Sequence, residues 1–297
     1  MQRRGSTLKG ITTLLLMVVN VCFWVPILMV VAVAKFVVPV QGWRKWTSRA
    51  MTALAEAWIS CNGAIFRVMR VLRLQVEGVA DLSPRDWYLV VSNHRSWVDI
   101  LVLQEAFNRR IPFLKFFLKQ QLIYVPLLGI AWWALDFPFM KRHSATYLAR
   151  HPEARGQDLA ATRKACERFA HIPTSVMNFV EGTRYTSAKR AAVKSPYRHL
   201  LPPRAGGIAF VLGAMGQMLH SVLDVTIAYR ERTPTLWDLC CGRLETVRVH
   251  VARRPIEAWT AAGDYMNDAA YRARFKQWLR EMWEEKDRRL EAMAAVS

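Results

Sequence analysis

A histidine and an aspartate in the first third of this 297-residue sequence are the residues whose types and spacing best suit chemistry. In the stretch VVSNHRSWVDI, residues 90–100, an apolar strand pattern ends at His94, and a helix pattern opens at Ser96 and includes Asp99. Residues five apart lie about 140° from each other on a helix and on opposite faces of a strand, so neither element alone joins the two side chains. A turn at Arg95 between strand and helix can return Asp99 to the ring. A histidine held at Nδ1 has Nε2 available to take a proton from a hydroxyl.

The same residues also allow a purely structural interpretation. Ser96 and Asp99 form the Ser-x-x-Asp pattern of a capping box, although this pattern does not explain His94. The sequence has no GxSxG motif, and none of its five cysteines has CxxC spacing or lies in a nucleophile motif. No metal site is therefore expected, and the reacting hydroxyl is expected to belong to a substrate. This favours direct transfer from an activated donor to an alcohol, and lipid hydrolysis by water stays an alternative.

A second candidate stretch is NFVEGTRYT, where a strand pattern ends in a polar turn. The turn presents Glu181, Gly182, Thr183 and Arg184. Gly182 permits close backbone approach, Thr183 can form a hydrogen bond, and the planar guanidinium of Arg184 suits a phosphate. Ordinary turn chemistry explains the stretch equally well.

Two further stretches place cations beside apolar sequence. Lys119, Lys141 and Arg142 accompany the aromatic-rich region 113–139, as an amphiphile with a phosphate head would require. The alternative is a membrane-apposed surface from which these cations reach into the headgroups. In LLPPRAGGIAF, Arg204 precedes a helix start that can attract an anion.

The charge and the apolar residues together indicate an anionic membrane surface. The formal net charge is +19 with 53% hydrophobic residues, and residues 10–34 contain no charged side chain. No nucleic-acid-binding motif accompanies the charge, so nucleic acid is not an expected partner. The uncharged run has basic flanks on both sides, which a hairpin broken at Pro26 would keep on one side of the bilayer. A single tilted spanning helix is the alternative.

The order of patterns predicts an α/β fold. Strand patterns alternate with helical patterns, which favours a single domain with a mixed central sheet flanked by helices. The expected strands include 72–79 and 174–180, and the expected helices include 50–71, 97–108, 158–170 and 265–294. We expect residues 1–45 to form an N-terminal membrane-embedded helical anchor and residues 46–297, including the helix 265–294, to form the catalytic domain.

Together these stretches resemble the lysophosphatidic acid acyltransferase family, the PlsC-like glycerolipid acyltransferases. NHRSWVD is similar to the NHxxxxD block of that family, FMKR to its second block, FVEGTR to its FPEGTR block and LLPPRAGG to its proline-containing fourth block. The blocks occur in the family's order over most of residues 70–230. WALDFPFMKR and WEEKDR are similar to the bacterial YihG-type branch. Val180 replaces the family's usual proline, and Gln121 stands where many members have glutamate.

The resemblance implies that His94 deprotonates an acceptor hydroxyl and that Asp99 orients and stabilises the imidazolium. The implied reaction moves a fatty acyl group from acyl-CoA or acyl carrier protein to the 2-hydroxyl of 1-acyl-sn-glycerol 3-phosphate, forming phosphatidic acid, or to another lysophospholipid. It needs no cofactor besides this co-substrate. The implied location is the bacterial inner membrane, with the catalytic domain on the cytoplasmic side among anionic lipids. The implied substrate-binding residues are Lys119, Arg142, Glu181, Gly182, Thr183, Arg184 and Arg204.

Overall fold

The computed structural model describes residues 2–38, 40–140, 166–167, 172–230, 233–244 and 246–295. The strands within these ranges are β1 (Arg73–Glu77), β2 (Tyr88–Ser92), β3 (Leu114–Phe116), β4 (Leu118–Lys119), β5 (Phe139–Met140), β6 (Ser175–Phe179), β7 (Ser221–Ala228) and β8 (Thr246–Arg254). The helices are α1 (Gln2–Val37), α2 (Gln41–Val68), α3 (Val98–Phe107), the 3₁₀ helix η1 (Gln120–Tyr124), α4 (Leu128–Ala134), α7 (Ser187–Ala192), α8 (Ala205–Met215), α9 (Leu236–Cys240), α10 (Ala258–Ala262) and α11 (Ala269–Ala295). The helix expected over 158–170 lies mostly outside the described residues.

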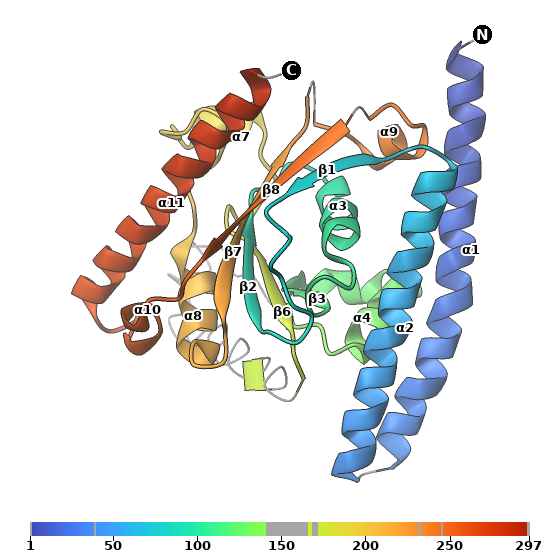
Figure 1. The fold of residues 1–297 in the computed structure, drawn as a ribbon, viewed down its shortest axis with the longest axis horizontal. Helices are drawn as coiled ribbons and strands as arrows, with labels where there is room; N and C mark the ends of the chain where they lie inside the picture. Colours follow the sequence, from blue (N-terminus) through green and yellow to red (C-terminus); the bar gives the residue numbers. More distant parts are fainter. Residues whose placement is uncertain are drawn as a thin grey trace.

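Six of these strands form one mixed sheet in the order β1-β8-β7-β2-β6-β3 (Figure 1). β2 runs parallel to β6 and β7, and β3 runs parallel to β6. β8 runs antiparallel to β7 and parallel to β1. One edge of the sheet, here called the carboxyl edge, therefore holds the carboxyl ends of β2, β3, β6 and β7 and the amino ends of β1 and β8. The predicted α/β fold with a mixed central sheet is confirmed.

The buried strand β2 places side chains on both faces of the sheet because successive residues of a strand point to opposite sides. Tyr88 and Val90 join the apolar cluster that includes residues of α1, α2 and α3. Leu89 and Val91 join the second cluster, which includes residues of α8 and α11. The helices consequently form two layers with the sheet between them (Figure 1).

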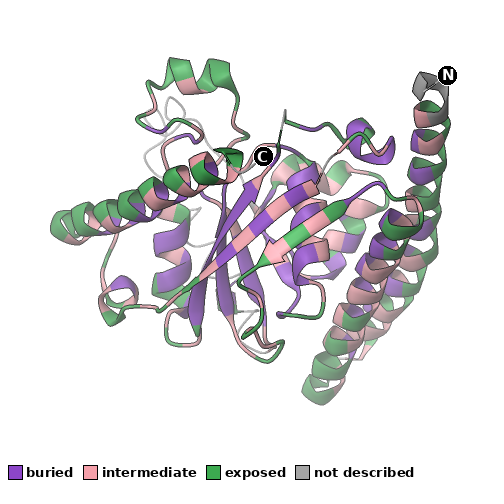
Figure 2. Cartoon of the chain, turned by 45° about the horizontal axis from the view of Figure 1, so that its top comes forward, coloured by how far each residue is buried: buried purple, intermediate pink, exposed green. Residues whose placement is uncertain are grey.

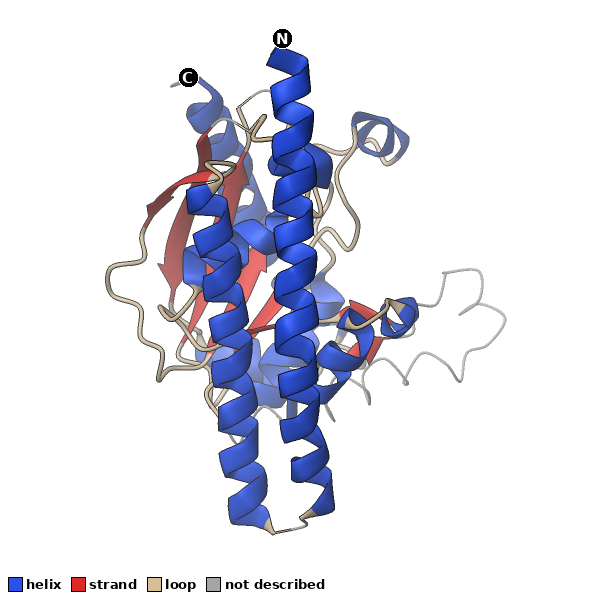
Figure 3. Cartoon of the chain, turned by 90° about the vertical axis from the view of Figure 1, so that its right-hand side faces the viewer, coloured by secondary structure: helices blue, strands red, loops and turns tan. Residues whose placement is uncertain are grey.

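The two N-terminal helices form an antiparallel pair along one side of the protein (Figure 3). The segment Ser6–Val37 of α1 is long and apolar enough to cross a membrane. Much of its surface is apolar and faces outward, including Leu15, Val19, Phe23 and Val30 (Figure 2). Such a large exposed apolar surface is typical of an interaction with lipid or another protein.

The predicted helix break at Pro26 is wrong, because α1 runs through this proline. A proline inside a helix removes one hydrogen bond, but here contacts on both sides of it hold the helix. Before it, Asn20 Nδ2 donates to Asn62 Oδ1 of α2 at 2.9 Å. After it, Lys35 pairs with Asp136 at 2.8 Å. The turn of the hairpin lies between α1 and α2, and the expected domain boundary at residue 45 falls inside α2, so that division stays a prediction.

A buried ion pair attaches α11 to β7. Lys286 and Asp224 are both fully buried, with Lys286 Nζ 2.5 Å from Asp224 Oδ1. Lys286 Nζ also donates to the carbonyl of Val225, and Arg254 lies 3.3 Å from the other Asp224 oxygen. Burial lowers the pKa of Lys286, and the nearby Asp224 carboxylate opposes this change. Removal of one partner would leave a buried charge with fewer compensating groups.

We predict that Lys286→Met lowers the free energy of unfolding by about 3 kcal/mol, because Asp224 stays buried without its nearest cation. Chemical unfolding of the detergent-solubilised protein measures this change. Lys276→Met, at an exposed position of the same helix, is the matched control and should change stability by less than about 0.5 kcal/mol. Equal stabilities of the two variants would contradict the prediction.

Candidate active site

The turn that follows β2 is fixed by a side chain that extends the sheet. Asn93 Nδ2 donates to the carbonyl of Ile227 in β7 at 2.9 Å, and the Ile227 N–H donates to Asn93 Oδ1 at 2.9 Å. Asn93 thus replaces the backbone partner that β7 would otherwise lose where β2 ends. The chain then leaves the sheet, and His94 lies at the carboxyl edge.

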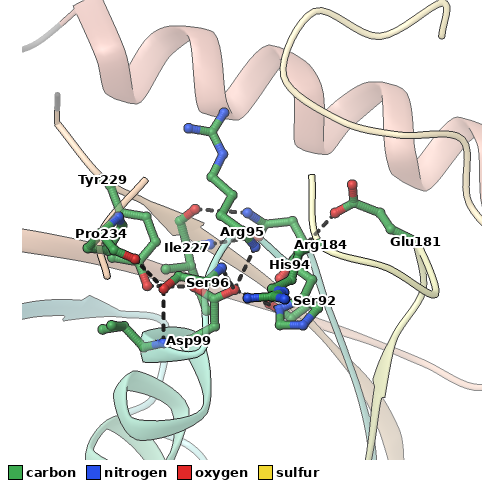
Figure 4. Close-up of polar contacts among 12 residues, drawn as sticks. Ser92, His94, Arg95, Ser96, Asp99, Glu181, Arg184, Ile227, Tyr229 and Pro234 are labelled. Atoms are coloured by element: carbon green, nitrogen blue, oxygen red, sulfur yellow. Dashed lines mark hydrogen bonds and ion pairs between the residues drawn. The ribbon is translucent and has the colours of Figure 1, made fainter. Parts of the chain in front are cut away.

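His94 and Asp99 are in contact in this turn (Figure 4). His94 Nδ1 lies 2.8 Å from Asp99 Oδ2. The imidazole stacks on Phe179 with the ring centroids 3.9 Å apart, and 16% of the side chain is exposed. Contacts therefore fix one nitrogen and one ring face, and His94 Nε2 has no hydrogen-bond partner among the described residues. This arrangement suits proton abstraction from a bound hydroxyl.

The Asp99 carboxylate is buried and accepts hydrogen bonds from several segments. Oδ2 accepts from the backbone N–H groups of Arg95 at 2.6 Å and Ser96 at 2.8 Å, besides facing His94. Oδ1 accepts from the hydroxyl of Tyr229 at 2.5 Å. The structural and catalytic interpretations of Asp99 are thus compatible, because one carboxylate orders the turn and orients the ring. The helix α3 begins at Val98, with Trp97 rather than Ser96 at its N-cap.

Glu181 lies behind the turn and joins it to a second loop. Its side chain is almost fully buried, Oε1 accepts from the His94 N–H at 2.8 Å, and Oε2 accepts from the Leu201 N–H at 2.9 Å. Burial raises the pKa of Glu181 to about 7, although the two N–H groups oppose this increase. Glu181 is thus placed to position the backbone of His94.

The rest of the EGTR turn lies beside His94. The Tyr185 N–H donates to the His94 carbonyl at 2.7 Å, which joins the turn to the strand end of β2. The Arg184 guanidinium lies 5.3 Å from the centre of the Trp97 ring, and Thr183 Oγ1 accepts from Lys189 Nζ at 2.7 Å. The turn that is bonded to His94 thus carries the cation of Arg184 and contacts the cation of Lys189.

The remaining predicted substrate-binding residues differ in placement. Gly182 has φ of +68°, and a Cβ there would lie 3.0 Å from Arg204 Cδ, so glycine suits both the turn and this contact. Arg204 is exposed beside this turn, at the N-cap of α8. Lys119 is exposed on β4, and no contact among the described residues joins it to His94. Arg142 lies outside the described residues.

Tyr229 is the residue at this site that the sequence interpretation missed. It follows β7, and β7 is next to β2 in the sheet. The sequence VLDVTIAY has a strand pattern that ends at Tyr229, but it does not show that β7 pairs with β2, and only this pairing brings Tyr229 to Asp99. Among the described residues, no group of three His, Cys, Asp or Glu side chains is arranged to hold a metal ion.

The mixed sheet and the oriented histidine at its carboxyl edge define an α/β protein with a candidate active site. Residues 73–230 match the family described as Acyltransferase, and the chain belongs to this family. It is 27% identical over 225 residues to mouse (Mus musculus) 1-acyl-sn-glycerol-3-phosphate acyltransferase gamma, covering 71% of this chain and 54% of the mouse protein. It is 25% identical over 257 residues to lysocardiolipin acyltransferase 1 of Danio rerio, covering 80% and 60% of the two chains. The chain spans little more than half the length of these curated relatives.

A solved structure has a similar fold. The crystal structure of the 1-acyl-sn-glycerophosphate (LPA) acyltransferase PlsC from Thermotoga maritima aligns with a TM-score of 0.57. The alignment covers 96% of this chain and 98% of that chain at 15% identity. The similarity extends over both the helical hairpin and the sheet, because nearly the whole chain is aligned.

We predict that Tyr229→Phe lowers kcat about tenfold with little change in the KM for the acceptor, because a buried carboxylate oxygen loses its donor. With fewer donors, the Asp99 carboxylate holds the His94 imidazolium more strongly, so the increase of kcat with pH should occur at a higher pH. Rates over a pH series measure both effects. Tyr185→Phe is the matched control, because its hydroxyl contacts the Arg198 carbonyl instead. An unchanged pH profile and kcat in Tyr229→Phe would show that the hydroxyl does not act on the pair of His94 and Asp99, here called the dyad.

We predict that Glu181→Gln changes the pH dependence of the unfolding free energy. A carboxyl group whose pKa rises from 4.5 to about 7 on folding contributes stability below pH 4.5 that is lost as the pH rises through 7. The amide does not titrate, so the difference in unfolding free energy between the two proteins should change between pH 5 and 8, with the wild type losing relative stability as the pH rises. Unfolding curves at four pH values test this. A constant difference over that range would contradict a raised pKa for Glu181.

Proposed function

We propose that this protein transfers a fatty acyl group from an acyl thioester to the 2-hydroxyl of 1-acyl-sn-glycerol 3-phosphate, forming phosphatidic acid. The observation that supports this most is His94, which is oriented by a buried carboxylate at Nδ1 and has no described partner at Nε2. The names of the relatives support the acceptor. Acylation of another lysophospholipid is the second candidate, because one relative is a lysocardiolipin acyltransferase.

The proposed mechanism needs one proton transfer and one acyl transfer. His94 Nε2 takes the proton of the acceptor hydroxyl while the oxygen attacks the thioester carbonyl, so a C–O bond forms and the C–S bond then breaks. Asp99 stabilises the imidazolium, which returns its proton to the leaving thiolate. A thiolate is a good leaving group, and general-base catalysis supplies roughly 10²–10⁴-fold in rate. Acyl-CoA or acyl carrier protein is the proposed co-substrate, with no other cofactor.

The acceptor's phosphate has candidate partners on the β6 side of His94. Arg184 stands over Trp97 and is near Thr183 and Lys189, and a guanidinium binds phosphate oxygens in pairs. Lys119, Arg142 and Arg204 stay proposed contacts of the same phosphate or of nearby headgroups.

The N-terminal helices support a proposed membrane location. Residues 1–45, which include α1, are proposed as the anchor, and residues 46–297 as the catalytic domain, facing the cytoplasm at a bacterial inner membrane rich in anionic lipids. The exposed apolar side chains of α1 and the net charge of +19 are compatible with this location. We further infer that the chain is most similar to the bacterial YihG-type branch of the family.

We predict that membranes containing the protein convert oleoyl-CoA and lysophosphatidic acid to phosphatidic acid, and that His94→Ala lowers this rate at least 10²-fold. Separation of all labelled lipid products after incubation with a panel of lysolipids measures the reaction and ranks the acceptors. The variant should stay in the membrane fraction, because the substitution leaves the apolar helix α1 unchanged. Release of free fatty acid without ester formation would indicate hydrolysis and contradict the proposal.

A further inference from the structure

A cationic cavity of about 560 Å³ lies at the carboxyl edge on the opposite side of His94 from Arg184. Its lining comes mainly from the amino ends of β1 and β8, the turn after β2, the segment after β7 and the last turns of α11. The arginines that line it are Arg70, Arg73, Arg95, Arg230 and Arg248. The described lining contains no carboxylate. A cavity of this volume accommodates a ligand of nucleotide size.

The cavity reaches the dyad through two of its lining residues. Arg95 is the residue directly after His94, and Tyr229 donates to Asp99. Arg95 Nε is buried and has no hydrogen-bond partner, although Arg95 Nη2 contacts the His199 carbonyl at 3.4 Å. A buried guanidinium N–H without a partner is costly unless a ligand or water satisfies it. The unpartnered atom therefore indicates where an anion would gain a charge-assisted bond.

The order of the strands separates this cavity from the proposed acceptor site. β6, which leads to Arg184, lies on one side of β2, whereas β7, β8 and β1 lie on the other. Two cationic regions thus flank His94 along one edge of the sheet. A transfer reaction needs two substrates at one histidine, and an acceptor with one phosphate needs fewer cations than the cavity provides.

We propose that this cavity binds the nucleotide end of acyl-CoA, through its diphosphate and 3′-phosphate, a step that rests on the proposed acyl transfer. The thioester arm then extends along Arg95 and Tyr229 toward His94. The guanidinium groups of Arg70 and Arg73 supply the outer contacts, since both side chains are exposed and neither has a hydrogen bond or ion pair among the described residues. Because this ligand is small and its phosphate charges are concentrated in one place, the cavity favours CoA over acyl carrier protein as the donor.

The test uses the full-length, detergent-solubilised protein and the double variant Arg70→Gln/Arg73→Gln. The KM for oleoyl-CoA should rise about tenfold or more, with kcat and the KM for lysophosphatidic acid within about twofold of the wild type. The affinity for adenosine 3′,5′-bisphosphate, measured by calorimetry, should fall by a similar factor. Arg85→Gln/Lys276→Gln removes the same charge from exposed positions outside the cavity lining and should change neither constant.

Three other outcomes would contradict the proposal, and a fourth would separate it from the proposed function. Unchanged KM and nucleotide affinity would show that the arginines bind no donor. Displacement of the nucleotide by glycerol 3-phosphate at equal concentration would assign the cavity to a lipid headgroup. If Arg70→Gln/Arg73→Gln raises the KM for acyl carrier protein as donor by the same factor, the cavity would be assigned to that protein's carboxylates. If the wild type makes no ester but binds the nucleotide, the proposed function fails while the nucleotide site stands.

Discussion

The carboxylate of Asp99 is the group on which the geometry of this site depends. It is buried, and a buried charge is tolerated only where hydrogen bonds replace water. Its donors come from the His94 ring, from the turn after β2 and from Tyr229 after β7. These donors are correctly spaced only when β2 and β7 are paired and α3 starts directly after the turn. The same contact that orients the histidine therefore connects the fold of two strands and a helix to the chemistry.

Two further buried groups keep that arrangement rigid. Glu181 joins the His94 backbone to the loop before α8, so the turn is held from the β6 side. Asp224 and Lys286 attach α11 to β7, and Tyr229 follows the same strand. Each carboxylate is desolvated and compensated by donors from a distant segment, which makes its position specific. The two contacts thus support His94 and Asp99 from β6 on one side of β2 and from β7 on the other.

The local parts of this site were predictable from the sequence, and the long-range parts were not. His94, Asp99 and the Glu181–Arg184 turn lie within short stretches whose strand and turn patterns fix their surroundings. Tyr229 and the cavity arginines other than Arg95 come from β1 and the residues just before it, from β8 and from the segment after β7, and strand order is not encoded in a local pattern. The Pro26 break was wrong for a similar reason, because α1 is held by Asn62 and Asp136, which lie far away in the sequence.

The positions of charge and apolar surface suggest how the two proposed amphiphilic substrates would share one histidine. The exposed apolar surface of α1 continues onto α4, where Phe36 stacks on Trp133 with the ring centroids 5.2 Å apart. Cations, by contrast, lie at the carboxyl edge on both sides of His94. An acyl chain gains most by leaving water, and a phosphate gains most from arginine. A substrate oriented by both effects would present to His94 the region between its tail and its headgroup. In the two proposed substrates, this region contains the acceptor hydroxyl and the thioester.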